Sequence, residues 1–346
     1  MTALQSLFGI ELPVIQAPMA GVQLSALAIA VSNAGGLGSL PCAMLSPKAV
    51  RTELEALKAG TRKPYNVNFF CHREPEPSPP REAAWREALA PYFHEFGIDP
   101  KGTAPGPGRA PFSAEAADVL EPFNPAVVSF HFGLPEKGLL ARVRAWGSKI
   151  LASATMVEEA RWLEAQGVDA IIAQGAEAGG HRGMFLTEEL TTQVGTFALL
   201  PQIVRAVRVP VIAAGGIADA AGLRAALALG AAGVQVGTAY LLCPEATTSA
   251  VHGAALKSEA ASHTALTNVF TGRPARGIVN RIVHELGPIC ALAPAFPLAT
   301  AAVMPLRTAA EATGSGDFSP LWSGQNATGC KDVPAARLTR ELAGSA

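Results

Sequence analysis

One histidine of this 346-residue chain stands in a sequence that suits proton transfer. His181 lies in the run 177–183, Glu-Ala-Gly-Gly-His-Arg-Gly, whose three glycines disfavour both helix and strand. We therefore predict a mobile or tightly turned loop. An imidazole in such a loop titrates near neutrality and can take a proton from a bound molecule. A surface histidine without a role is the simpler interpretation, so the place of the loop in the fold has to decide.

Two glycine turns later in the chain indicate an anion site. Gly215 and Gly216 follow the run Ala213-Ala214, and Gly237 lies within Gln235-Val236-Gly237-Thr238. Turns of small residues let backbone N–H groups face an anion, and a hydroxyl at Thr238 can donate a further hydrogen bond. A helix expected to begin near Thr238 would add the positive end of its dipole. We predict a phosphate site here; the alternative is that the glycines only permit tight turns.

The size of the phosphate-bearing ligand follows from motifs that are missing. No GxGxxG opens a helix after a strand and no GxxxxGK[ST] occurs, so a dinucleotide held by a Rossmann fingerprint is not supported. A mononucleotide such as FMN needs only one phosphate grip and a slot for a planar ring. We expect Ala17, Pro18 and Met19 to lie against that ring, and Asn68 and Gln174 to hydrogen-bond its polar edge.

His131 is a second histidine of interest, and Met19 is expected to reach the substrate as well as the cofactor. His131 stands between Phe130 and Phe132 at the end of a short apolar run. Such a residue either forms a wall of the substrate pocket or is a core histidine with satisfied hydrogen bonds. Both interpretations stay open at this point.

The elements that must position these residues repeat along the chain. A short β-branched run is followed by a Gly or Pro loop and then by an Ala/Leu-rich amphipathic stretch, which is typical of a parallel sheet with crossover helices. The predicted strands are 13–17, 36–40, 65–69, 126–130, 149–153, 170–174, 209–213 and 233–236. The predicted helices between them include 25–33, 47–58, 157–166, 196–207 and 220–229.

Eight such units favour an α/β fold of the closed (β/α)8, or TIM, barrel type over an open α/β sheet, which is the alternative. Active sites of these barrels lie at the carboxyl ends of the strands, and phosphate sites follow the seventh and eighth strands. His181 follows the sixth predicted strand, and the two glycine turns follow the seventh and eighth. This placement favours catalysis over a surface role for His181.

Two regions do not fit the repeat. Residues 71–121 are rich in proline and glycine, with one helical patch at 81–90 that Pro91 should end, and we expect an excursion near the barrel mouth. Residues 246–346 read as helices and loops without clear strands. We predict a barrel domain over 1–245 and a smaller, mostly helical cap or substrate domain over 246–346, whose last helix, 335–342, packs back on the barrel.

Composition excludes several classes of function. Apolar residues make up 49% of the chain and charged residues 16%, and the net charge of −1 gives no reason to expect a nucleic-acid or membrane partner. The five cysteines are scattered and show no CxxC spacing, so neither a disulfide framework nor a metal site is expected. No secretion signal is evident, and we expect a cytoplasmic protein that is either a monomer or a dimer.

Taken together, the ordered motifs resemble the nitronate monooxygenase family, formerly called 2-nitropropane dioxygenases. The resemblance covers roughly residues 10–285. It is carried by 14–19 (Val-Ile-Gln-Ala-Pro-Met), 33–39 (Asn-Ala-Gly-Gly-Leu-Gly-Ser), 66–69 (Asn-Val-Asn-Phe), 174–183, 214–217 (Ala-Gly-Gly-Ile), 235–238 and 272–281 (Gly-Arg-Pro-Ala-Arg-Gly-Ile-Val-Asn-Arg).

The resemblance implies a flavoenzyme that oxidises alkyl nitronates with O2. It implies a non-covalent FMN and His181 as the base that takes the α-proton of a neutral nitroalkane. The residues that it places around the FMN are Asn68, Gln174, Gly179, Gly216, Gln235, Val236, Gly237 and Thr238. We expect the neighbouring Gly180 and Gly215 to contact the cofactor as well. A small nitronate such as propionate 3-nitronate is the expected substrate.

The chain departs from the family pattern after about residue 285. Family members often bring tyrosines and a lysine towards the site there. Residues 293–308 of this chain contain Phe296 but no tyrosine or lysine, and Arg307 is their only cation. Two rival functions stay open: an FMN-dependent NAD(P)H reductase of quinones or enoyl thioesters, and a flavin-free phosphate-binding isomerase or lyase.

Overall fold

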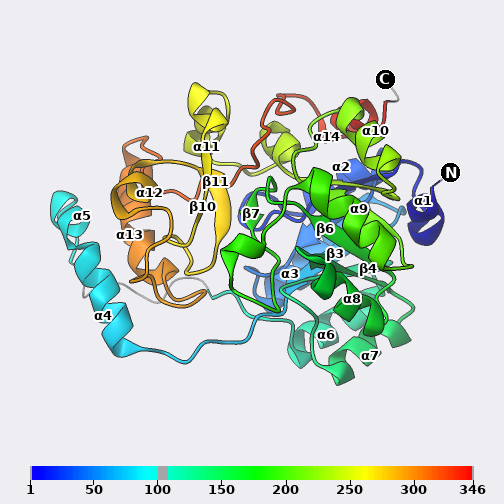
Figure 1. Ribbon diagram of the computed structural model, residues 1–346, viewed down its shortest axis with the longest axis horizontal. Coiled ribbons are helices and arrows are strands. Elements are labelled where there is room, and N and C mark those ends of the chain that lie inside the picture. The colour runs from blue at the N-terminus through cyan, green and yellow to red at the C-terminus, as the bar shows by residue number, and fades with distance from the viewer. Residues whose placement is uncertain (1, 100–107, 345–346) are drawn as a thin grey trace.

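A closed parallel barrel forms the larger part of the molecule (Figure 1), in a computed structural model that describes residues 2–99 and 108–344. The sheet order is β1-β9-β8-β6-β5-β4-β3-β2, and a parallel bridge between Ile15 and Leu37 joins the two ends. The prediction of eight strands in a closed barrel is confirmed. The strands are β1 (Val14–Gln16), β2 (Gly38–Pro41), β3 (Tyr65–Phe70), β4 (Val127–His131), β5 (Lys149–Ala154), β6 (Ala170–Gln174), β8 (Val211–Ala214) and β9 (Gly233–Val236).

Amphipathic helices cover the outside of the barrel. α3 shows why they form: the Ser46 hydroxyl caps the helix, Pro47 occupies its first turn, and Val50, Leu54 and Leu57 bury one face. Each predicted helix of the repeat is present to within two residues. The helices are α2 (Ser25–Asn33), α3 (Pro47–Gly60), α6 (Ala114–Leu120), α7 (Lys137–Ala145), α8 (Val157–Ala165), α9 (Thr196–Ala206) and α10 (Ala220–Ala228).

The amino-terminal end of the barrel is closed by apolar packing. Helix α1 (Ala3–Phe8) places Leu4 and Phe8 in one buried cluster with Ile15 and Ile212 from the barrel strands. Because this end is filled, a ligand cavity inside the barrel can open only at the carboxyl ends of the strands. No helix in the described part of the chain is long and apolar enough to cross a membrane.

A second lobe is built around a small antiparallel sheet. Strand β10 (Thr264–Thr267) pairs with β11 (Ala275–Ile278), which pairs in turn with the two-residue strand β7 (Gly180–His181) that follows β6. The expectation of no strands in 246–346 was therefore wrong. These runs are four residues long and lack a β-branched pattern, so their strand form depends on pairing between distant segments. Helices α11 (Ala250–Leu256), α12 (Arg281–Leu286) and α13 (Thr300–Ala312) complete the lobe.

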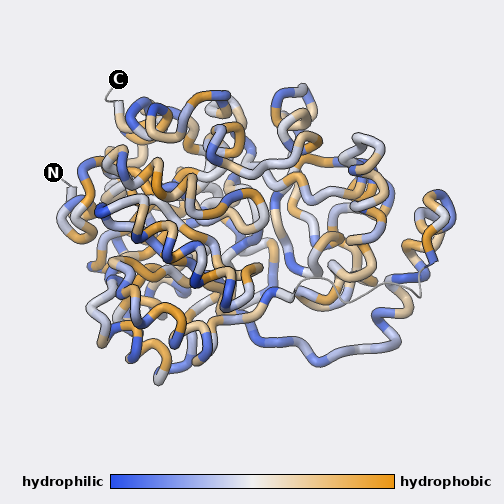
Figure 2. The backbone as a smooth tube through the Cα atoms, turned by 180° about the vertical axis from the view of Figure 1, so that it is seen from behind, coloured by the Kyte–Doolittle hydropathy of each residue, from blue (hydrophilic) through white to orange (hydrophobic). Residues whose placement is uncertain are grey.

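The excursion after β3 leaves the barrel and packs on the second lobe. A hydrophilic stretch leads to α4 (Pro79–Ala88) and α5 (Ala90–Glu95), as Figures 1 and 2 show. Trp85 and Phe93 are buried against Val303 and Phe318 of the second lobe. Pro91 does not end the helical region as predicted, because it lies in the first turn of a new helix, where its missing N–H costs nothing.

The last helix returns to the barrel, as expected. Helix α14 (Ala335–Leu342) contacts α2 and α10, and its buried side chains, including Leu338 and Leu342, join the main core. The excursion thus packs on the second lobe, whereas the final helix packs on the barrel. The division at residue 245 stays a prediction.

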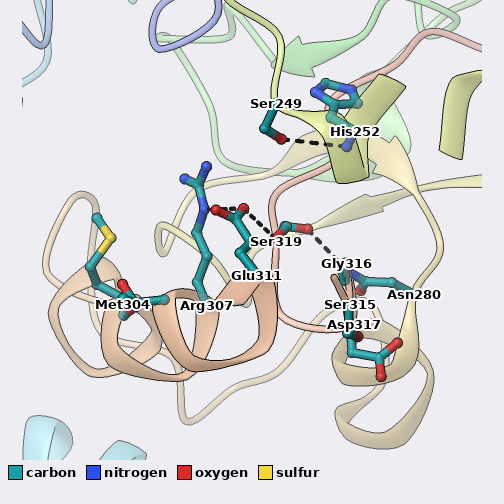
Figure 3. A network of polar contacts seen from close by, with 11 residues as sticks. Ser249, His252, Asn280, Met304, Arg307, Glu311, Ser315, Gly316, Asp317 and Ser319 are labelled. Atoms are coloured by element: carbon teal, nitrogen blue, oxygen red, sulfur yellow. Dashed lines mark hydrogen bonds and ion pairs between the residues drawn. The ribbon is translucent and has the colours of Figure 1, made fainter. Parts of the chain in front are cut away.

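A polar network fixes the segment that leads from the second lobe back to the barrel (Figure 3). Glu311 accepts hydrogen bonds from Arg307 Nε at 2.8 Å and from the Ser319 hydroxyl at 2.6 Å. Asn280 Nδ2 donates to the carbonyls of Gly316 and Ser319. The network therefore ties residues 316–319 to α13 and α12, just before the chain enters the cavity wall.

Candidate active site

A cavity opens at the carboxyl ends of the barrel strands, where ligands of such barrels bind. Every site residue predicted from the sequence lines this one cavity: Ala17, Pro18, Met19, Asn68, His131, Gln174, Gly179, Gly180, His181, Gly215, Gly216, Gln235, Val236, Gly237 and Thr238. The individual roles of these residues stay predictions.

The two glycine turns expose their backbone N–H groups to the cavity. Gly215 and Gly216 have φ angles of 121° and 72°, which favour glycine. Their amides and that of Gly237 have no acceptor among the described residues. The Thr238 hydroxyl accepts a hydrogen bond from the Gly324 amide at 2.9 Å, so its own proton is free to donate. The helix expected at Thr238 is the five-residue 3-10 helix η4 (Thr238–Leu242), whose dipole is small.

Sequence reasoning missed the segment 323–326, which completes the wall beside these turns. Besides the bond from Gly324 to Thr238, the Gln325 amide donates to the Glu177 carbonyl at 2.9 Å and Asn326 Nδ2 donates to the Gly216 carbonyl at 3.0 Å. The segment approaches so closely that a Cβ at Gly179 would lie 2.6 Å from the Gly324 backbone. Its sequence, Ser-Gly-Gln-Asn, resembles an ordinary surface turn, so only its contacts reveal it.

Two further side chains of the cavity carry acceptor atoms without partners in the described part of the chain. Gln235 Oε1 is buried and has no hydrogen-bond partner there, although the cost of burying such an atom is about 1–3 kcal/mol. Asn68 uses Nδ2 to donate to Ser129, which leaves its Oδ1 as an acceptor. Gln174 is already engaged: its Nε2 donates to the His181 carbonyl, and its Oε1 accepts from the Gly183 amide. A ligand edge that donates hydrogen bonds fits Gln235 and Asn68.

The loop that carries His181 is tightly turned and held by hydrogen bonds, which is one of the two forms predicted for it. The guanidinium of Arg182 is fully buried and donates to the carbonyls of Gln174 and Gly175, each at 2.7 Å, and to Gln193 at 2.8 Å. His181 itself lies in β7 and is paired with Ala275 of β11. Positive φ at Gly180 allows this strand to start directly after the turn.

One ring nitrogen of His181 is tied to the second lobe and the other faces the cavity. Nε2 lies 2.9 Å from the Thr271 hydroxyl, which is 3.3 Å from the Arg273 carbonyl and can donate to it. If Thr271 donates there, His181 donates from Nε2 and Nδ1 carries the lone pair. Nδ1 has no partner among the described residues and keeps accessible surface.

Four aromatic rings surround His181. The ring centroids of Phe296, Trp322, Phe132 and Phe70 lie 5.3, 5.5, 6.0 and 6.1 Å from that of the imidazole. These rings give the imidazole apolar surroundings. Burial lowers the pKa of His181 well below its ordinary value, and the positive charge of Arg109 adds to the effect. The imidazole is therefore neutral at neutral pH, which is the form that accepts a proton.

His131 lines the cavity and has a hydrogen-bond partner at each ring nitrogen, so both predicted interpretations stay predictions. Its Nε2 lies 3.1 Å from the His181 carbonyl, which can only accept, so this nitrogen carries the proton. Its Nδ1 then accepts from the Ser153 hydroxyl at 3.0 Å. Burial lowers the pKa of His131 to about 4. His131 is thus neutral and fixes the backbone of His181.

Several further side chains reach the cavity without any warning from the sequence. Arg109 arrives from the excursion, Trp322 from the segment that the polar network fixes, and His252 from α11. His252 donates from Nε2 to the Trp322 carbonyl at 3.0 Å, so its position is structural. Within the described residues, no group of three or more His, Cys, Asp or Glu side chains is placed to hold a metal ion.

Comparison with known proteins gives one consistent family. A family model described as nitronate monooxygenase matches residues 1–344. A nitronate monooxygenase of Pseudomonas aeruginosa is 44% identical over 97% of this chain and 96% of its own length, and one of Paraburkholderia phytofirmans is 43% identical over 98% and 93%.

Solved structures show the same likeness. A nitroalkane oxidase from Streptomyces ansochromogenes superposes with a TM-score of 0.88 at 39% identity, covering 99% of this chain and 97% of that one. FabK from Thermotoga maritima gives a TM-score of 0.73 at 27% identity, with coverage of 100% and 96%.

Proposed function

Because this chain belongs to the nitronate monooxygenase family, whose members are flavin-dependent, we propose that it oxidises alkyl nitronates with O2 to a carbonyl compound and nitrite. One observation carries the proposal. A single cavity brings free backbone amides on two glycine turns together with the unpartnered Nδ1 of His181. The first feature suits a cofactor phosphate and the second suits a proton acceptor beside it.

FMN is the cofactor that these residues fit. The amides of Gly215, Gly216 and Gly237, with the Thr238 hydroxyl, would hold its phosphate without a lysine or arginine. Gln235 and Asn68 would accept hydrogen bonds from the edge of the ring. When bound, the flavin supplies the redox chemistry, taking an electron from the nitronate in a reaction that consumes O2.

His181 supplies the base for neutral nitroalkanes. Its Nδ1 takes the α-proton, while Nε2–H remains on the Thr271 hydroxyl and steadies the imidazolium that forms. His131 and Gln174 hold the His181 carbonyl at 3.1 and 3.0 Å, so the ring keeps its position during the transfer. General-base catalysis of this kind contributes typically about 10²- to 10⁴-fold.

A nitronate is already deprotonated and does not need this base. The site then acts by its positive charges, since Arg109 and Arg273 both contribute to the potential at His181. We propose a small substrate such as propionate 3-nitronate, as the family resemblance implies. A cytoplasmic location belongs to the same proposal.

Oxygen uptake tests the function directly. Purified yellow protein mixed with ethyl nitronate in air should consume O2 and release nitrite and acetaldehyde, and NADH should not be required. Uptake that depends strictly on NADH, or no uptake at all, contradicts the proposal.

The reductase alternative keeps one specific support, the likeness to FabK. Anaerobic mixing with NADH separates the two functions, because rapid bleaching of the flavin followed by reoxidation with a quinone or an enoyl thioester would favour the reductase. A colourless protein without flavin absorbance would favour the flavin-free alternative.

A further inference from the structure

We propose that the cavity contains a second anion site at Arg109, which takes a carboxylate carried by the nitronate substrate. The inference rests on the proposed function for the identity of the substrate. It rests on the structure for the presence of the site, through the hydrogen bonds, burial and charge balance of one arginine.

Arg109 is a buried charge with no counter-charge among residues 2–99 and 108–344. The residue is 9% exposed and lines the cavity. Among the described residues no carboxylate forms an ion pair with it, and burial and the charge of Arg307 lower its pKa to about 10. A buried cation is expensive unless it is paired, so an arginine kept in this state is a candidate for binding an anion.

The hydrogen bonds of Arg109 leave a forked edge unused. Nη1 donates to the Thr300 hydroxyl at 3.0 Å, and this hydroxyl donates onward to the Phe270 carbonyl at 3.1 Å. Nε and Nη2 have no acceptor among the described residues. These two donors form one planar edge of the guanidinium, which matches the two oxygens of a carboxylate.

The arginine is placed to bind one end of a molecule that reaches His181. Its guanidinium carbon lies 5.8 Å from the centroid of the Phe296 ring, and that ring lies 5.3 Å from the His181 ring. Phe296 thus contacts both residues, and both line the same cavity. A nitronate carbon beside His181 and a carboxylate on Arg109 therefore fit one small, doubly negative substrate.

Arg307 provides a contrast on the same side of the cavity. It lies near enough to Arg109 to lower the pKa of Arg109, but its own Nε is paired with Glu311 at 2.8 Å (Figure 3). Its charge is therefore neutralised, and it does not line the cavity. The free positive charge on this side belongs to Arg109.

The test compares two nitronates that differ only in charge, those of 3-nitropropionate and 3-nitropropionamide. Arg109→Met should lower kcat/KM for the carboxylate about 10- to 100-fold, as expected for a lost charge-assisted pair, and change it less than about threefold for the amide. Arg109→Lys should recover part of the loss, because it restores the charge without the fork. Arg307→Met is the matched control and should leave the ratio of the two substrates unchanged.

A binding measurement separates this inference from the proposed function. Propionate, titrated anaerobically into the flavin-loaded enzyme and followed by flavin absorbance, should bind wild type at least tenfold more tightly than Arg109→Met. This result supports the site even if no nitronate is turned over. Three results would each overturn the proposal. Arg109→Met could lower kcat/KM equally for both nitronates, or Arg307→Met could change the ratio of the two substrates as much as Arg109→Met does. The third is an equal propionate affinity in wild type and Arg109→Met, both folded and yellow.

Discussion

Replacement of Thr271 by valine isolates the contribution of the bond that orients His181. The hydroxyl lies 2.9 Å from Nε2, in a residue that is 1% exposed, and valine fills nearly the same volume. A neutral hydrogen bond contributes about 1 kcal/mol, and one to a charged group about 1.5–3 kcal/mol. When Nδ1 takes the proton, as proposed, the bond from Nε2 changes from a neutral hydrogen bond to one from a charged group. Removal of the Thr271 hydroxyl therefore destabilises the transition state by about 1–2 kcal/mol more than the ground state. We expect kcat/KM for neutral nitroethane to fall about 5- to 30-fold.

The assay compares oxygen uptake with nitroethane and with ethyl nitronate, which bypasses proton removal. Thr271→Val should lower only the first rate, and Thr271→Ser, which keeps the hydroxyl, should restore it. The reasoning is refuted if Thr271→Val slows both substrates equally, or if serine fails to rescue, because the defect would then be one of folding or cofactor binding.

Three further predictions follow from the same site. His181→Asn should lower kcat/KM for nitroethane by at least about 100-fold and leave ethyl nitronate within a few fold of wild type; comparable losses would remove the base assignment. Gly179→Ala places a methyl 2.6 Å from the Gly324 backbone and should weaken FMN binding, measured by fluorescence titration, by about 1–3 kcal/mol. Gly138→Ala is the control and should leave FMN binding unchanged, because its methyl meets no atom within 4 Å. Unchanged FMN affinity in both variants would contradict this account of the cavity wall. The free energy of unfolding should fall as pH drops from 6.5 towards 4, because burial lowers the pKa of His72, His131 and His252 to about 4 and the unfolded chain takes up protons first. His131 alone accounts for about 3 kcal/mol at full protonation, so the unfolding free energies from urea melts at pH 7 and 4.5 should differ less for His131→Gln than for wild type. The same pH dependence in both proteins would refute this origin.

The barrel could be predicted from the sequence because its signals are local. Each strand is a short apolar run bounded by glycine or proline, and α3 carries its own cap, first-turn proline and apolar face. The residues at the ends of the strands could be gathered into one cavity for the same reason, since a parallel barrel brings all carboxyl ends together.

The second lobe could not be predicted in the same way, because its elements depend on distant partners. The strand form of 275–278 arises from pairing with 264–267 and 180–181, and neither partner is evident from its own composition. Arg109 is a similar case. Its role depends on the missing counter-charge in three dimensions, whereas in the sequence it is one arginine in a proline-rich stretch.

The sequence left open whether the His181 loop is mobile or tightly turned, because glycine content indicates only what the backbone is able to do. The decisive residue is the neighbouring Arg182, whose guanidinium closes the loop onto three acceptors. An arginine directly after the histidine looks like a solvated charge in the sequence, and only its burial shows that it acts as a brace.

The segment 323–326 has a consequence for how the enzyme is made. The amides of Gly324 and Gln325 and the side chain of Asn326 brace turns that were synthesised about a hundred residues earlier. The barrel strands are thus synthesised before the residues that complete the proposed cofactor site. On the proposed function, we expect that a chain truncated before residue 323 binds FMN more weakly than the full chain.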